Sequence, residues 1–73
     1  GLMSITPGVE HRIWKTPKGY GILVWSSRDQ KVEMKFSKPM SIQMKDSGKL
    51  IKSSHTQTLT FALSGNPVMV YAE

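Results

Sequence analysis

Residues 58–73 decide the fold, because they read TLTFALSGNPVMVYAE, two apolar runs on either side of a turn sequence. In the first run, Leu59, Phe61 and Leu63 alternate with more polar residues, which is the pattern of a strand with one buried face. The residues at 64–67, SGNP, predict a tight reversal, since glycine and asparagine tolerate positive φ and proline lacks the amide hydrogen of a central strand. The second run, VMVYA at 68–72, alternates again. The stretch therefore predicts the two closing strands of an antiparallel sheet.

The same alternation locates the other strands. The predicted runs are HRIWK at 11–15, YGILVWSS at 20–27, KVEMKF at 31–36, MSIQM at 40–44 and a short strand at 50–51, with loops at 26–30 and 52–56. With the closing pair, these runs predict an all-β fold, an antiparallel β-sandwich of about seven short strands at roughly ten-residue spacing. A small β-barrel is the alternative. The run at 20–27 is apolar on both faces, so it predicts a central strand.

The length of 73 residues sets the scale of stability. A single core of this size contributes only about 3 to 5 kcal/mol of net stability, so support from a neighbour is expected. We expect one all-β domain over residues 1–73, excised from a longer protein. Because Gly1 and Leu2 precede Met3, residues 1–9 are expected to be a flexible or cloning-derived start. No apolar run approaches the roughly 18 residues of a membrane span, and without cysteine there is neither a disulfide nor a thiolate metal site.

The formal net charge of +5 raises the question of nucleic-acid binding. The ten basic residues are spread along the chain and mostly alternate with apolar residues, as the solvated face of a sheet requires. We therefore interpret them as solvated surface. The alternative function is a small basic β-barrel that binds single-stranded nucleic acid through Trp14, Tyr20 and the surrounding Lys and Arg.

Few side chains are available for catalysis. The carboxylates Glu10, Asp29, Glu33 and Asp46 lie in predicted turns or on polar strand faces, so no paired acid and base is expected. The two histidines, His11 and His55, have no metal-ligand spacing to each other or to an acid. The sequence predicts no catalytic residue, no metal site and no cofactor.

The aromatic residues are the candidate binding residues. Trp14, Tyr20, Trp25 and Tyr71 can form a platform on which a sugar ring or a base stacks, or they can cover a core or an interface. Alternation places Leu23 and Trp25 on one face of their strand, and Met69 and Tyr71 on one face of theirs. We expect Leu23, Trp25, Met69 and Tyr71 to lie opposite the core and to pack against a neighbouring domain.

Three segments together carry a resemblance: GILVWSS, KVEMKFSKPMSIQMKDSGK and TLTFALSGNPVMVYAE. Their order resembles that of the small all-β domain found beside the catalytic barrel in many glycoside hydrolases. The resemblance spans roughly residues 20 to 73. The matching positions are Trp25, Asp46, Gly48, Leu63, Ser64, Gly65, Pro67, Val68, Val70 and Tyr71.

The resemblance implies a non-catalytic accessory domain of a carbohydrate-active enzyme. Such a domain packs against the neighbouring catalytic domain of the same chain and stabilises it, with weak carbohydrate contact as a further function. Extracellular or periplasmic placement follows from this resemblance alone.

Overall fold

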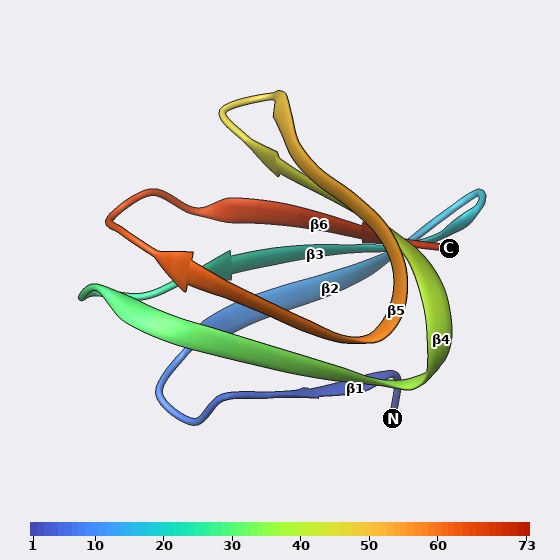
Figure 1. Ribbon diagram of the computed structural model, residues 1–73, viewed down its shortest axis with the longest axis horizontal. Helices are drawn as coiled ribbons and strands as arrows, with labels where there is room; N and C mark the ends of the chain where they lie inside the picture. Colours follow the sequence, from blue (N-terminus) through green and yellow to red (C-terminus); the bar gives the residue numbers. More distant parts are fainter.

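A computed structural model describes all 73 residues and contains six strands and no helix. The strands are β1 (Met3–Ile5), β2 (Glu10–Thr16), β3 (Gly19–Trp25), β4 (Gln30–Asp46), β5 (Lys49–Leu63) and β6 (Val68–Ala72). Figure 1 shows that β4 and β5 are long and sweep together around one side of the molecule. The predicted all-β class is confirmed.

All pairs are antiparallel and belong to one curled sheet with the order β1-β4-β6-β3-β2, while β5 pairs with β4. The first half of β4 lies between β1 and the end of β5, and its second half lies between β6 and the start of β5. The bent β4 and β5 therefore belong to two layers. The first layer contains β1, and the second contains β2, β3 and β6, so the fold is intermediate between a small sandwich and a barrel.

Six strands are found where about seven were predicted, because β4 and β5 each join two predicted runs and β1 was not predicted. The bend in β4 joins the first pair of runs. Lys35 faces Thr58 and Met40 faces Thr56, so residues 36–39 oppose only Gln57. The Gln57 side chain donates a hydrogen bond to the Phe36 carbonyl at 3.2 Å within this irregularity. Pro39, which cannot donate to a ladder, is accommodated here, and the two runs predicted on either side of it form one bent strand.

The predicted loop at 52–56 is likewise part of a strand. These residues pair with Met40–Met44 of β4. Their polar side chains predicted a loop, but β4 supplies hydrogen-bonding partners for their backbone. The predicted short strand at 50–51 and the strand that begins at Thr58 are thus one element, β5. A second irregularity lies nearby, because Met44 faces Lys52 while Lys45 faces Leu50.

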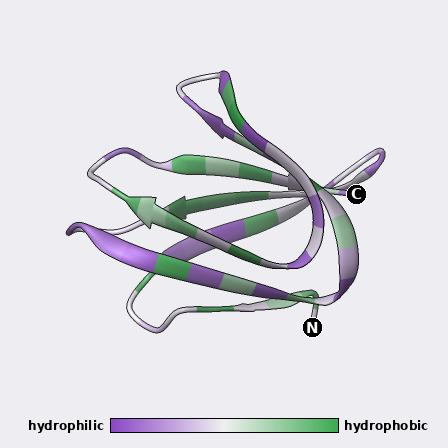
Figure 2. Ribbon diagram, viewed as in Figure 1, coloured by the Kyte–Doolittle hydropathy of each residue, from purple (hydrophilic) through white to green (hydrophobic).

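The core fills the space inside the curled sheet and contains 14 buried apolar side chains. Val32, Met34, Phe36, Leu59 and Leu63 are buried as the alternation predicts. The remaining members are Val9, Ile22, Val24, Met40, Ile42, Met44, Val68, Val70 and Ala72. Figure 2 shows the resulting alternation of hydrophobic and hydrophilic segments along β4.

Phe61, predicted to belong to the core, is only partly buried and packs against the cluster. It lies on β5, which pairs with β4 alone. One edge of β5 is therefore uncovered. Leu59 and Leu63 on the same side of this strand are nevertheless buried, and the Phe61 ring lies at the margin of the core.

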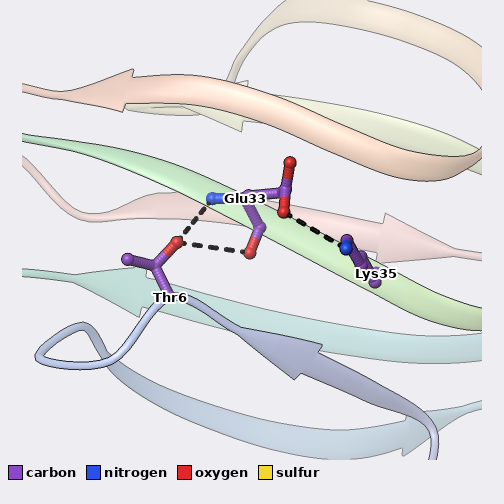
Figure 3. A network of polar contacts seen from close by, with 3 residues as sticks. All are labelled: Thr6, Glu33 and Lys35. Carbon is purple, nitrogen blue, oxygen red and sulfur yellow. Dashed lines mark hydrogen bonds and ion pairs between the residues drawn. The ribbon is translucent and has the colours of Figure 1, made fainter.

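Within residues 1–9, for which a flexible or cloning-derived start was expected, Met3–Ile5 forms β1 and pairs with β4. Met3, Ser4 and Ile5 pair with residues 34–36. The Glu33 amide donates to the Thr6 hydroxyl at 2.8 Å, and this hydroxyl donates to the Glu33 carbonyl at 3.4 Å (Figure 3). β1 covers the edge of the first half of β4, whereas β6 pairs only with the second half. A strand of three residues is too short to be predicted from alternation.

Candidate functional site

The outer side of the second layer presents an apolar surface, which we call the aromatic face: Trp14, Leu23, Trp25, Met69 and Tyr71. Residues directly opposite each other on paired strands share a face of the sheet. Gly21 on β3 lies opposite both Trp14 on β2 and Tyr71 on β6. Leu23 lies opposite Met69, and Trp25 follows two residues further along β3. From Gly21 to Trp25 the face extends about 13 Å along this strand.

The side chains of the aromatic face remain partly open to solvent. Trp14 is 38% exposed, and the other four are half-buried, whereas the alternate residues Ile22, Val24 and Val70 are fully buried. The expectation that Leu23, Trp25, Met69 and Tyr71 lie opposite the core therefore agrees with the register and the burial.

The Trp14 indole lies over Gly21. A Cβ atom built on Gly21 would meet Cε2 and Cζ2 of this ring, and would lie 2.8 Å from its Nε1. Only glycine therefore allows the indole to approach the backbone of β3 so closely. This approach brings the ring toward Tyr71, the other residue that lies opposite Gly21.

Tyr71 is flanked on its other side by polar residues of β4. Gln43 lies directly opposite it, and the Lys45 ammonium lies 5.5 Å from the centre of the Tyr71 ring. A cation at this distance is attracted by the negative face of the ring. The aromatic face thus ends in a polar border along β4.

Tyr20, the fourth aromatic residue predicted to bind a ligand, lies on the opposite side of β3. It has the phase of Ile22, lies opposite Ala72 and packs against the core. The structure therefore brings Trp14, Trp25 and Tyr71 to one face and separates Tyr20 from them, because successive side chains of a strand point in opposite directions.

The outer side of the first layer is polar. Lys31, Glu33 and Lys35 of β4 are exposed there, together with Thr58 and Thr60 of β5. The Lys35 ammonium lies 3.7 Å from the Glu33 carboxylate, and both side chains are mostly exposed (Figure 3). The two outer surfaces of one sheet therefore differ sharply in polarity.

Positive charge does not gather on the aromatic face. Arg12 lies opposite Leu23 and Lys45 lies opposite Met69, while Glu10 lies opposite Trp25. The other basic residues belong to turns, to the bend or to other faces: Lys15, Lys18, Arg28, Lys31, Lys35, Lys38, Lys49 and Lys52. A surface that binds single-stranded nucleic acid combines aromatic rings with a basic groove. On the aromatic face two basic residues, Arg12 and Lys45, accompany the rings, and Glu10 lies beside them.

A polar hollow of about 330 Å³ lies beside the aromatic face. Its walls come from β4, from the start of β5 and from the end of the chain. The lining residues are Ser41, Ile42, Gln43, Ser53, Ser54, His55 and Glu73. The hollow was not predicted from the sequence, because residues 52–56 were expected to form a loop and no local pattern indicates that Glu73 meets Ser41.

The carboxylates do not assemble into a reactive site. Glu33 pairs with Lys35, and Asp46 accepts a hydrogen bond from the Ser47 hydroxyl at 3.3 Å. No group of three or more His, Cys, Asp or Glu residues gathers to hold a metal ion. None of the chain forms a helix long and apolar enough to cross a membrane.

No protein-family model, no curated protein and no solved structure matches the chain. The resemblance to accessory domains of glycoside hydrolases therefore rests on the sequence positions given above.

Proposed function

We propose that the chain is a non-catalytic β-domain that packs, through its aromatic face, against a neighbouring domain of the same longer protein. One observation carries the proposal. Five apolar side chains remain partly exposed on one outer face, whereas the outer face of the first layer is polar. Contiguous apolar surface rimmed by polar residues is typical of interaction sites.

Packing would also offset the limited stability of a chain of this length. Each 100 Å² of apolar surface that the partner covers contributes about 2.5 kcal/mol before the entropic cost of association. Covalent linkage lowers that cost, because the second contact becomes intramolecular. A modest contact could therefore match the roughly 3 to 5 kcal/mol that the core of a small domain supplies.

The partner class in this proposal is the catalytic barrel of a carbohydrate-active enzyme, as the sequence resemblance implies. The chain would stabilise that barrel without contributing an acid, a base or a nucleophile. Its effect should then appear in the melting temperature of the enzyme and leave the chemistry of bond cleavage unchanged.

Sedimentation of the isolated chain over a range of concentrations tests the packing surface. We expect weak, reversible self-association through the uncovered aromatic face, which Leu23→Ser and Met69→Ser each reduce. Ala62→Ser is the matched control, because it makes an exposed residue of the polar outer face more polar and should leave association unchanged. A chain that stays monomeric at millimolar concentration, or a control that is as disruptive as Leu23→Ser, would contradict the proposal.

A further inference from the structure

Strand β2 is the last strand of the second layer, and one of its edges has no partner strand. It pairs with β3 alone, and Figure 1 shows it as the outermost of β6, β3 and β2. Residues 10–15 are all exposed, and Thr16 is half-buried. Along this free edge of residues 10–16, which we call the β2 edge, the backbone groups of alternate residues point away from β3 and can pair with an added strand.

Native sheets usually carry a device that prevents pairing at a free edge, and the other two free edges of this sheet have one. β1 has three residues, and the ladder of β5 with β4 is interrupted twice. The β2 edge has neither device, because its seven residues pair with β3 in one unbroken register and contain no proline. Its backbone geometry therefore suits the addition of a strand.

Positive charge is the one protective device that the β2 edge carries. Arg12 and Lys15 lie on the strand, Lys18 lies in the turn that follows, and Glu10 is the one acidic residue. None of these side chains forms an ion pair within the chain. Two copies of this edge would repel each other, whereas an acidic strand would be attracted. The charge therefore selects an acidic partner over a second copy of the chain.

Apolar side chains on both sides of β2 provide contact area for such a strand. Ile13 is 39% exposed and Trp14 is 38% exposed, and as neighbours on a strand they point to opposite sides of the sheet. Ile13 lies opposite Ile22, on the core side, whereas Trp14 belongs to the aromatic face. Aliphatic side chains opposite these two residues would pack on both sides of the sheet while the backbones pair.

We propose that the β2 edge binds an extended acidic segment of a partner protein. The segment adds as an antiparallel strand, with acidic residues opposite Arg12 and Lys15 and aliphatic residues opposite Ile13 and Trp14. Antiparallel addition continues the pairing of the whole sheet and is slightly more stable per residue than parallel addition. The proposal goes beyond domain packing, because it concerns an edge of the sheet and a separate partner.

The test is an NMR titration of the full chain, labelled with ¹⁵N, against the capped peptide Thr-Glu-Val-Ile-Glu-Thr-Lys, which pairs in this order with residues 16 to 10. We expect saturable shifts of the amides at 10–16. The charge-reversed peptide Thr-Lys-Val-Ile-Lys-Thr-Glu should bind at least about tenfold more weakly. Methylation of the Val and Ile amides should abolish binding, because successive amides of a strand point to opposite edges and one of these two must face β2.

Three results of the titration would overturn the proposal. They are the absence of saturable shifts at residues 10–16, equal binding of the acidic and charge-reversed peptides, and undiminished binding of the methylated peptide.

A charge reversal in the protein assigns the interaction to the β2 edge. Lys15→Glu should weaken binding of the acidic peptide about fivefold to tenfold and strengthen binding of the charge-reversed peptide. Lys31→Glu is the matched control, because Lys31 is also an exposed strand lysine but belongs to β4, and it should change the affinity less than about twofold. Equal effects of the two variants would show attraction by net charge alone and would overturn the assignment.

Sedimentation separates this proposal from the packing of the aromatic face. A second copy at the β2 edge would appear as self-association that Lys15→Glu changes and Lys31→Glu does not, and this result would overturn the proposal. The packing proposal is decided independently by Leu23→Ser and Met69→Ser, because neither residue lies on β2.

Discussion

Gly21→Ala tests the placement of Trp14, which anchors one end of the aromatic face. The backbone of Gly21 has no positive φ, so alanine fits its extended conformation. The added methyl group would meet Cε2 and Cζ2 of the Trp14 indole, and this ring would have to move away. The substitution should therefore act on one side chain and leave the sheet intact.

The two contributions to stability nearly cancel. Alanine in place of glycine within a strand favours folding by about 0.5 to 1 kcal/mol, because the unfolded chain loses freedom. If the displaced indole gives up about 40 Å² of apolar contact, the loss is about 1 kcal/mol. We expect the free energy of unfolding to change by less than about 1 kcal/mol.

Gly19→Ala provides the contrast. A Cβ atom on Gly19 would meet the Ala72 carbonyl oxygen and would lie 3.1 Å from Glu73 Cα, and both belong to the backbone. Backbone cannot rotate away as an indole can, so β3 and β6 would have to separate. We expect a cost of about 1 to 3 kcal/mol or more, a large part of the stability of so small a domain.

Denaturant unfolding of both variants measures these differences. In a Trp25→Phe background Trp14 is the remaining indole, and Gly21→Ala should shift its emission to the red and increase its quenching by acrylamide. Unchanged Trp14 emission together with a stability loss as large as that of Gly19→Ala would refute the reasoning, because it would show that the indole does not lie over Gly21.

Four further predictions follow from the core, the hollow and the charges. Leu59→Ala should cost about 2 to 5 kcal/mol because Leu59 is 1% exposed, whereas the adjacent Thr60→Ala should be nearly silent; denaturant melts with equal effects would contradict the phase of β5. Ser54→Ala should raise the free energy of unfolding by about 1 kcal/mol or more, since it removes a buried hydroxyl without a partner; a clear loss in the same melts would argue against this. The dissociation constant for a single-stranded oligonucleotide, measured by fluorescence anisotropy at physiological salt, should lie in the non-specific range of about 10⁻⁴ to 10⁻⁶ M. A sub-micromolar dissociation constant that is lost on changing Trp14 would favour the nucleic-acid function. The isolated chain should not hydrolyse aryl glycosides or polysaccharides, and turnover that disappears on neutralising Glu10, Asp29, Glu33 or Asp46 would overturn the non-catalytic assignment.

Much of the fold could be predicted because alternation reports directly on burial. The pattern in Val32, Met34 and Phe36 places three side chains inside, and the same rule separates Val70 from Met69 and Tyr71. Continuity of the strands could not be predicted in this way. Pro39 is typical of a strand end, yet β4 continues through it. The irregularity opposite Gln57 accommodates the proline, and that irregularity is formed by the partner strand β5.

The candidate site shows the same limit. The phase of β3 and β6 predicts that Leu23, Trp25, Met69 and Tyr71 share one face. That Trp14 joins this face depends on the pairing of β2 with β3, which places its indole over Gly21. Tyr20 was grouped with the other aromatic residues by type, although its phase assigns it to the core side. The hollow could not be predicted at all, because Ser41, Ser54 and Glu73 come together only through long-range pairing.

The most direct test of the proposed packing surface is the concentration dependence of the amide chemical shifts of the isolated chain, from micromolar to millimolar. If the aromatic face is the contact surface, the shifts will change at residues 21–25 and 69–71 and will stay constant at residues 31–35 and 58–62 of the polar outer face. Shifts that are independent of concentration at every residue, or changes confined to the polar outer face, would contradict the account.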